Sequence, residues 1–292
     1  MKLIKPSFEI LEQLPGLEGM YKQIELAGRT CYKSEDKITE TSAKEFVDRM
    51  IKSGHGAMLE HGTVYLYFYY TSPLKDLAYI ELTNMHRKYQ MNKHSHVYKE
   101  VVNNFTTHVY VTTNLRVLVE NNWLDDLQYI CEPTEYHEKR ITVKFVCDRG
   151  VSHEYVRHRV FSFAQESTRY CNYSKDKFGN EITFVFPIWM DEEELASYGP
   201  YHTVCRSKTP ESIFIALLNN AEQDYKALID MGWKAQQARA ILPNALKTEL
   251  VMTGFVSDWK HFFELRDAGS AHPQARELAQ PLHEEFIKRN WV

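Results

Sequence analysis

The sequence predicts an α+β fold: a central, mostly antiparallel sheet with flanking helices, a helical C-terminal third and an inserted α/β segment. Two observations predict it. Segments rich in β-branched and aromatic residues, typical of strands, fall in the first two thirds of the chain, and apolar residues at helical spacing dominate the last third. Strands followed by helices favour α+β over a doubly wound parallel sheet, in which the two alternate regularly.

Two helices and a turn are predicted near the start of the chain. Apolar residues recur at helical spacing over 19–33 and again over 41–53. Thr41 or Ser42 is placed to cap the second helix, because a hydroxyl there accepts from a free backbone N–H. Beyond it, Gly54 and Gly56 bracket a turn.

A strand is predicted at 63–71, which reads Thr-Val-Tyr-Leu-Tyr-Phe-Tyr-Tyr-Thr. The polar stretch after it, 72–139, is interpreted as a small α/β elaboration. A strand at 141–147, a short helix at 150–159 and strands at 168–173 and 182–187 follow. The last third is predicted to be helical, with Pro243 ending its second helix. The expected helices cover 211–231, 234–241, 244–254, 257–267 and 273–288.

Composition restricts the function classes. The 292 residues are 43% hydrophobic and 25% charged with a net charge of -4, which argues against a general nucleic-acid coat or a polybasic membrane binder. No apolar run approaches the ~20 residues of a membrane helix, and the start lacks a signal-peptide apolar region. We expect one domain over 1–292, located in the cytoplasm. The scattered cysteines fit a reduced compartment: Cys31, Cys131, Cys147, Cys171 and Cys205.

The segment Arg157-His158-Arg159-Val-Phe-Ser-Phe-Ala-Gln-Glu-Ser167-Thr-Arg169-Tyr is the most informative part of the chain. Arginines among aromatic and small polar residues indicate a site for something anionic and planar, because the guanidinium donates two hydrogen bonds and stacks on rings. Gln165 and Glu166 are candidates to read the edge of a nitrogen base. If 168–173 is a strand, Arg169 and Cys171 share one face. A surface or interface ion-pair network is the alternative.

Two further clusters carry candidate residues. His55, Glu60 and His61 lack the spacing of a zinc-protease helix, so we expect no metal there. A role beside an aromatic cofactor and a purely structural anchor for the next strand both remain open. In the predicted helix 257–267, Phe262, Phe263 and Leu265 should face the core. Arg266 should then either meet an anion or cap a helix end.

Together these elements resemble the flavin-dependent thymidylate synthases. The resemblance rests on Arg157-His158-Arg159, then seven residues, then Ser167-Thr168-Arg169-Tyr170, and on three shorter elements in the same order as in that family. The shorter elements are His55 with Glu60 and His61, Arg239 with Leu242 and Pro243, and Phe262 with Leu265 and Arg266.

The resemblance implies an α+β enzyme that methylates dUMP to dTMP with methylenetetrahydrofolate as carbon donor, with FAD carrying reducing equivalents from NADPH. It also implies a homotetramer with shared active sites. The implied catalytic residue is Arg266, at the uracil edge. Implied flavin-binding residues are His55, Arg157, His158, Arg159, Gln165 and His261. Implied dUMP-binding residues are Glu154, Arg157, Gln165, Glu166, Ser167, Thr168, Arg169, Arg239 and Arg266.

The chain departs from the family in places. Phe255 stands where many members carry a flavin-contacting Asn, and Ala164-Gln165 replaces Asn-Glu. The gap between His55 and Arg157 is longer than in compact members, so we expect a family-atypical insertion at about 73–140 that packs outside the core or shields the site. The rival interpretation is a module that binds single-stranded nucleic acid by stacking. The acidic net charge argues against it, and we expect neither a nucleic-acid nor a membrane partner.

Overall fold

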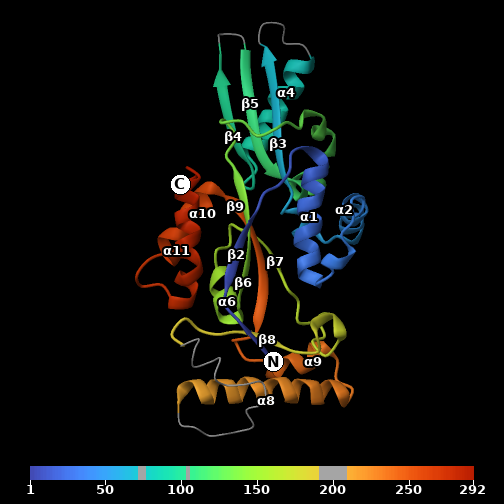
Figure 1. Cartoon of the computed structure of the whole chain (residues 1–292). Coiled ribbons are helices and arrows are strands. Elements are labelled where there is room, and N and C mark those ends of the chain that lie inside the picture. Colours follow the sequence, from blue (N-terminus) through green and yellow to red (C-terminus); the bar gives the residue numbers. More distant parts are fainter. Residues whose placement is uncertain (72–76, 103–105, 191–208) are drawn as a thin grey trace.

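The computed structural model describes residues 1–71, 77–102, 106–190 and 209–292, and a four-stranded sheet lies at its centre (Figure 1). The strand order is β2-β6-β9-β7 and every pairing is antiparallel. The predicted central, mostly antiparallel sheet is confirmed, and the strand predicted at 141–147 is β6. The four strands are β2 (Ser7–Leu11), β6 (Arg140–Asp148), β7 (Ser162–Gln165) and β9 (Lys247–Phe255).

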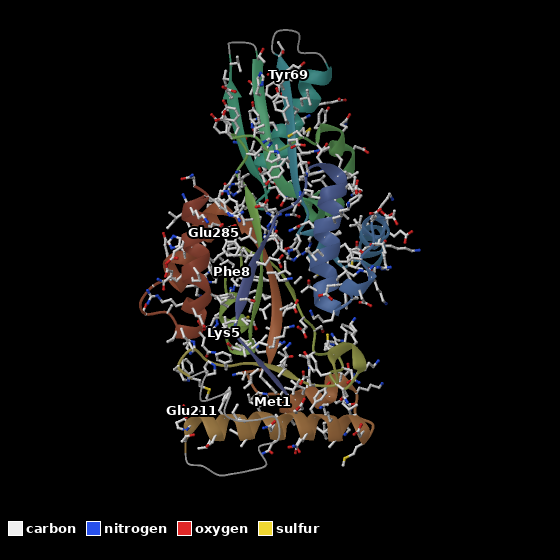
Figure 2. All side chains as sticks on the ribbon, in the orientation of Figure 1. Met1, Lys5, Phe8, Tyr69, Glu211 and Glu285 are labelled. Atoms are coloured by element: carbon white, nitrogen blue, oxygen red, sulfur yellow. The ribbon has the colours of Figure 1, made fainter. Side chains whose placement is uncertain are left out.

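Helices α10 (Val256–Arg266) and α11 (Pro273–Lys288) cover one face of this sheet and confirm two predicted helices. Trp259, Phe262 and Phe286 are fully buried there, and Phe8 of β2 packs against the same cluster from the sheet (Figure 2). Leu265 was expected in this core but is 49% exposed. The prediction was wrong because the apolar face of α10 runs through positions 259, 262 and 263, and position 265 falls outside that stripe.

Helices α1 (Gly16–Tyr32) and α2 (Ser42–Ser53) lie on the opposite side and confirm the predictions at 19–33 and 41–53. Ala27 of α1 packs on Val251 of β9. No side chain caps α2. The Ser42 hydroxyl instead donates to Glu25 Oε2 over 2.8 Å, so the capping prediction was wrong. Gly54, with φ +70°, ends α2 and begins the predicted turn, which leads into α3 (Gly56–Leu59).

A second antiparallel sheet, of order β3-β5-β4, lies at the top of Figure 1. Its first strand, β3 (Thr63–Thr71), confirms the prediction at 63–71. We call the described residues from 77 to 139 the inserted unit; they form an α/β elaboration, as predicted, with a core shared with β3. The expected start of the insertion, residue 73, lies outside the described residues. The unit comprises α4 (Leu77–Gln90), β4 (His96–Val101), β5 (Thr106–Asn114), α5 (Leu115–Glu120) and a 3₁₀ turn (Leu124–Tyr129).

A third layer lies at the bottom of Figure 1, where β1 (Lys2–Ile4) pairs in parallel with β8 (Thr183–Val185). Strand β8 confirms the strand predicted at 182–187. Helix α8 (Pro210–Asp230) confirms the one predicted at 211–231. The helix predicted at 234–241 is two short pieces, α9 (Ala235–Ala238) and a 3₁₀ turn (Arg239–Ile241), both of which end before Pro243. Cys205 lies outside the described residues.

Two predicted elements were wrong and one was too long. Residues 244–254 do not form a helix; most of them belong to β9, the strand that pairs with both β6 and β7. Residues 168–173 do not form a strand, because the N–H groups of Tyr170 and Cys171 both donate to the Ser167 carbonyl and close a turn. The helix predicted at 150–159 is α6 (Arg149–Tyr155), which ends before the arginine cluster. Across the described ranges, no helix is both long and apolar enough to span a bilayer.

Candidate active site

The Arg266 guanidinium joins the ends of α6 and α10. Its Nε donates to His158 Nε2 over 3.0 Å, and its Nη1 donates to Glu154 Oε2 over 2.6 Å. Its Nη2 donates to the Glu154 carbonyl over 2.8 Å, which satisfies a backbone acceptor at the end of α6. Both expectations for Arg266 therefore hold, since it meets an anion and closes a helix end. Three of its five N–H donors are engaged, leaving two.

His158 is buried between Arg266 and the aromatic core. Its ring lies 5.0 Å from that of Phe262 and 6.4 Å from that of His261. Burial, followed by the Arg266 cation, lowers the pKa of His158 to about 4. The ring is therefore neutral at pH 7, and its Nε2 accepts the hydrogen bond from Arg266. His261 is 63% exposed beside this buried group.

A second group forms around the turn that follows β7. Arg239 Nη1 donates to Thr168 Oγ1 over 3.1 Å, which joins two predicted elements 71 residues apart. The Ser167 N–H donates to the Cys31 carbonyl over 3.0 Å and so fixes the turn to the end of α1. Arg169 is exposed in the same turn, with its guanidinium 5.5 Å from the Tyr170 ring centre. The turn thus presents hydroxyls and guanidinium groups together.

Gln165 and Glu166 leave β7 on opposite faces of the sheet, as successive strand residues do. The Gln165 amide donates to Ser152 Oγ over 2.8 Å and to Thr248 Oγ1 over 3.2 Å, on the side of α6. Glu166 is 2% exposed, and both of its carboxylate oxygens are engaged on the side of α1. The two side chains therefore do not read one base edge together in this structure.

Glu166 is the buried end of a half-buried ladder of alternating charges that the sequence did not indicate. Lys247 Nζ lies 2.8 Å from Glu166 and 2.5 Å from Glu249, and Lys33 Nζ lies 2.6 Å from Glu249. Burial raises the pKa of Glu249, but the two lysines outweigh burial and bring the pKa down to about 2. No sequence signal pointed to Lys247, because its segment was interpreted as a helix.

The cluster at residues 55–61 divides into two parts. His55 is exposed, and its Nδ1 lies 3.4 Å from the Tyr32 hydroxyl. The Tyr32 ring lies 5.5 Å from that of Tyr170, which links His55 to the signature turn. By contrast, His61 is fully buried with Nδ1 2.8 Å from Thr253 Oγ1 of β9, while Glu60 pairs with Arg116. His61 and Glu60 therefore hold the loop to β9 and to Arg116 of α5, and not to the strand at 63–71 that the structural alternative named.

Four predicted arginines have no carboxylate partner among the described residues. In the described ranges, Arg157, Arg159, Arg169 and Arg239 form no ion pair, although other arginines of the chain do. A network of ion pairs within the chain is therefore not the reason for this cluster. Cations without counter-ions are suited to bind an anion from outside the chain.

Cysteine chemistry does not fit the site. Burial raises the pKa of Cys131 to about 11 and that of Cys171 to about 12. Burial also raises the pKa values of Cys31 and Cys147. The thiolate is the nucleophilic form, so these four thiols are poor nucleophiles at neutral pH.

The fold and site define an α+β protein with arginine side chains gathered at the ends of α6, β7 and α10. The model of the family described as "Thymidylate synthase complementing protein" matches residues 133–290, more than half of the chain. The chain belongs to this family, which confirms the resemblance. The signature, Arg239 and Arg266 lie inside the matched region, and His55 lies outside it.

Curated relatives of this chain support the same family. A protein of Pyrococcus furiosus named "Flavin-dependent thymidylate synthase" is 33% identical over 144 residues, 49% of this chain and 52% of that protein. A protein of the same name from Corynebacterium aurimucosum is 24% identical over 259 residues, 88% of this chain and 71% of that protein. The chain thus spans about half the length of the Pyrococcus relative.

Among solved structures, the UMP/dUMP methylase PolB of Streptomyces cacaoi bound with 5-Br dUMP aligns over 99% of this chain and 93% of its own. The TM-score is 0.43 and the sequence identity 16%. This likeness is too slight to carry an argument.

Proposed function

We propose that this protein methylates dUMP to dTMP, taking the carbon unit from methylenetetrahydrofolate and reducing equivalents from NADPH through bound FAD. Family membership and the names of the curated relatives support the reaction. The observation that carries it is the set of four arginines of the predicted elements, Arg157, Arg159, Arg169 and Arg239, that form no ion pair within the described ranges. An anionic nucleotide would supply the missing negative charge.

For dUMP, the turn after β7 would hold the phosphate. Ser167, Thr168 and Arg169 lie in the turn, and Arg239 is joined to it through Thr168. Glu166 would act indirectly, because its buried carboxylate accepts a hydrogen bond from Lys247 and so positions that lysine near the turn.

The base would lie toward the Arg266 guanidinium, among Glu154, Arg157 and Gln165. The two free N–H donors of Arg266 can meet the uracil edge. A cation there favours the ionised imide, because an opposite charge within a few ångströms shifts a pKa by about 1 to 3 units.

The residues present fit a flavin at most of the positions that the family implies. Arg157 and Arg159 are exposed and form no ion pair with any described carboxylate. His55 is exposed beside the turn after β7, and His261 is exposed beside His158. His158 is buried and would act mainly by orienting Arg266. The position of Phe255 does not fit a flavin contact, because His96 stacks on that ring at 4.0 Å. Bound FAD would supply the hydride chemistry, and the chain would supply position and charge.

A homotetramer with shared sites, acting in the cytoplasm, completes the proposal. Val160 is 66% and Tyr170 61% exposed, although both lie within the signature. Large apolar side chains exposed around a binding cluster are suited to an interface between protomers. We also propose that residues 1–292 form one catalytic domain carrying an insertion at about 73–140.

The test is an absorbance spectrum of the purified protein with and without added FAD, followed by NADPH oxidation with and without dUMP. We expect flavin absorbance, oxidation that responds to dUMP, and dTMP formation only when methylenetetrahydrofolate is present. A colourless protein that gains no flavin absorbance would refute the proposal. Retention of single-stranded DNA by that colourless protein would favour the nucleic-acid-binding alternative.

A further inference from the structure

A cleft of about 590 Å³ lies between the inserted unit and the central sheet. The inserted unit contributes Lys93, His96 and Arg116 to its walls. The central part of the chain contributes Arg140 at the start of β6 and Arg159 of the signature. Residues far apart in the sequence thus bring four cations to one cleft.

Arg140 is the deepest of these cations, and within the described ranges no carboxylate forms a direct ion pair with it, although Glu60 and Asp258 lie near enough to act on its charge. Its Nη1 donates to the Glu60 carbonyl over 2.9 Å, and its Nη2 lies 3.4 Å from Ser162 Oγ. Its Nε is buried without a hydrogen-bond partner, and within the described ranges the side chain forms no ion pair. Burial lowers the pKa of Arg140 to about 10, although Glu60 and Asp258 oppose this effect. Burying a cation that has no direct ion pair costs free energy, which an anion entering the cleft would offset.

The carboxylates in the cleft wall are already engaged. Arg116 pairs with both Glu60 and Glu120. Asp258 accepts the Phe255 N–H over 3.0 Å at the start of α10. Arg159 and Lys93 form no ion pair in the part of the chain that the structure describes, and the carboxylates of Glu60 and Asp258 act on Arg140 without pairing with it directly. The cleft wall thus carries four cations, Lys93, Arg116, Arg140 and Arg159, against the three carboxylates Glu60, Glu120 and Asp258. The charge left over in the cleft is therefore positive.

A flat aromatic surface lies beside these cations. The His96 ring stacks on that of Phe255 at 4.0 Å with 27° between the planes, and the Arg140 guanidinium lies 5.4 Å from the Phe255 ring centre. His96 also pairs with Glu138, whose Oε1 accepts the Ser257 N–H over 3.2 Å. These contacts fix the inserted unit against the start of α10, so the cleft is a built feature of the fold.

We propose that this cleft binds the phosphate group of a dinucleotide, and that Lys93 of the inserted unit and Arg140 are binding residues together with Arg159. The inference rests on the proposed function, in which Arg159 meets the flavin. It gives the inserted unit a role in ligand binding, since that unit supplies one cationic wall. The two sources of the phosphate are the pyrophosphate of FAD and the 2′-phosphate of NADPH.

The test uses the double variant Lys93→Gln with Arg159→Gln, because both side chains are exposed and their loss leaves the buried Arg140 contacts intact. Lys288→Gln, 79% exposed at the end of α11, is the matched control for loss of surface charge. Calorimetry with inorganic pyrophosphate serves as a probe that does not depend on catalysis. We expect the double variant to weaken pyrophosphate binding at least about tenfold, as expected for lost charged hydrogen bonds. The control should match the parent protein.

Nucleotide pairs then identify the source of the phosphate. If FAD supplies it, the single variant Lys93→Gln, which keeps Arg159 in place, loses affinity for FAD but not for riboflavin. If NADPH supplies it, the preference for NADPH over NADH disappears. Failure of the parent protein to bind pyrophosphate, or equal binding by the double variant, would overturn the inference even in a protein that makes dTMP. Conversely, if the protein binds pyrophosphate but makes no dTMP, the inference about the cleft is supported and the proposed reaction is refuted.

Discussion

Replacing Glu166 with Gln tests whether the half-buried charge ladder supports the signature turn. Glu166 is 2% exposed and accepts from Lys247 Nζ over 2.8 Å and from the Tyr173 hydroxyl over 3.0 Å. The substitution keeps the volume and one acceptor oxygen but removes the negative charge. Lys247 would keep Glu249, 2.5 Å away, as its only carboxylate.

The expected loss follows from these contacts. Breaking a buried pair by removing one partner costs about 3–5 kcal/mol. Since Lys247 keeps one carboxylate and Gln can still accept from Tyr173, we expect a loss of about 2–3 kcal/mol in the free energy of unfolding. Glu9→Gln is the matched control, because Glu9 is 61% exposed in its pair with Lys144. Its loss should stay below about 1 kcal/mol.

The free energy of unfolding of both variants is measured by urea unfolding at one fixed protomer concentration. The slope of that free energy against urea concentration should be the same in each variant. dUMP affinity is measured in parallel on the folded proteins. If the ladder supports the turn, Glu166→Gln should weaken dUMP binding along with stability, and Tyr173→Phe should weaken both to a smaller degree. A Glu166→Gln protein as stable as Glu9→Gln would refute the reasoning. Full stability with lost dUMP binding would show that the carboxylate contacts the substrate directly.

Three further predictions concern other parts of the molecule. Arg266→Ala should lower turnover by about 100-fold or more, because the substitution removes positive charge from the edge of the base, while FAD affinity should change far less. Stopped-flow turnover and flavin titration together check this prediction. Because folding lowers the pKa of His158 from 6.5 to about 4, its contribution to stability is complete above about pH 6.5 and is lost as the pH falls toward 4. Urea unfolding across that range should therefore show a shallower pH dependence in His158→Asn. Gly254→Ala places a Cβ 2.5 Å from the Phe161 ring and should cost about 1–3 kcal/mol, whereas Gly269→Ala meets nothing within 4 Å and should leave the thermal midpoint unchanged.

The sequence predicted the fold class and most elements because their signals are local. The aromatic run at 63–71 and the amphipathic helix at 41–53 need no distant partner to be recognised. The segment 244–254 failed for a physical reason. It combines helix-forming Ala, Leu, Lys and Glu with a short apolar run, and such a run does not distinguish a buried strand from a buried helix. Its state is decided by pairing with β6 and β7 on both sides.

The candidate site was predictable as a set of residues but not as an arrangement. The resemblance named Thr168, Arg239 and Arg266, but neither the Thr168–Arg239 bond nor the fork on Glu154 follows from spacing. The opposite directions of Gln165 and Glu166 depend on where β7 ends, and the predicted strand began about six residues too late to show it. Long-range pairing, which local patterns do not encode, determines each of these features.

The segment that was wrongly predicted as a helix forms most of strand β9, and this strand is central to the site. Its residues alternate between the two faces of the sheet, so Lys247 and Thr253 point toward α1, where they meet Glu166 and His61. Thr248 points to the other face, where it accepts from the Gln165 amide. A slip of one residue in the pairing of β9 would exchange the two faces and break all three contacts at once. The register of this one strand, set by nine pairs with β6, therefore fixes the separate motifs relative to one another.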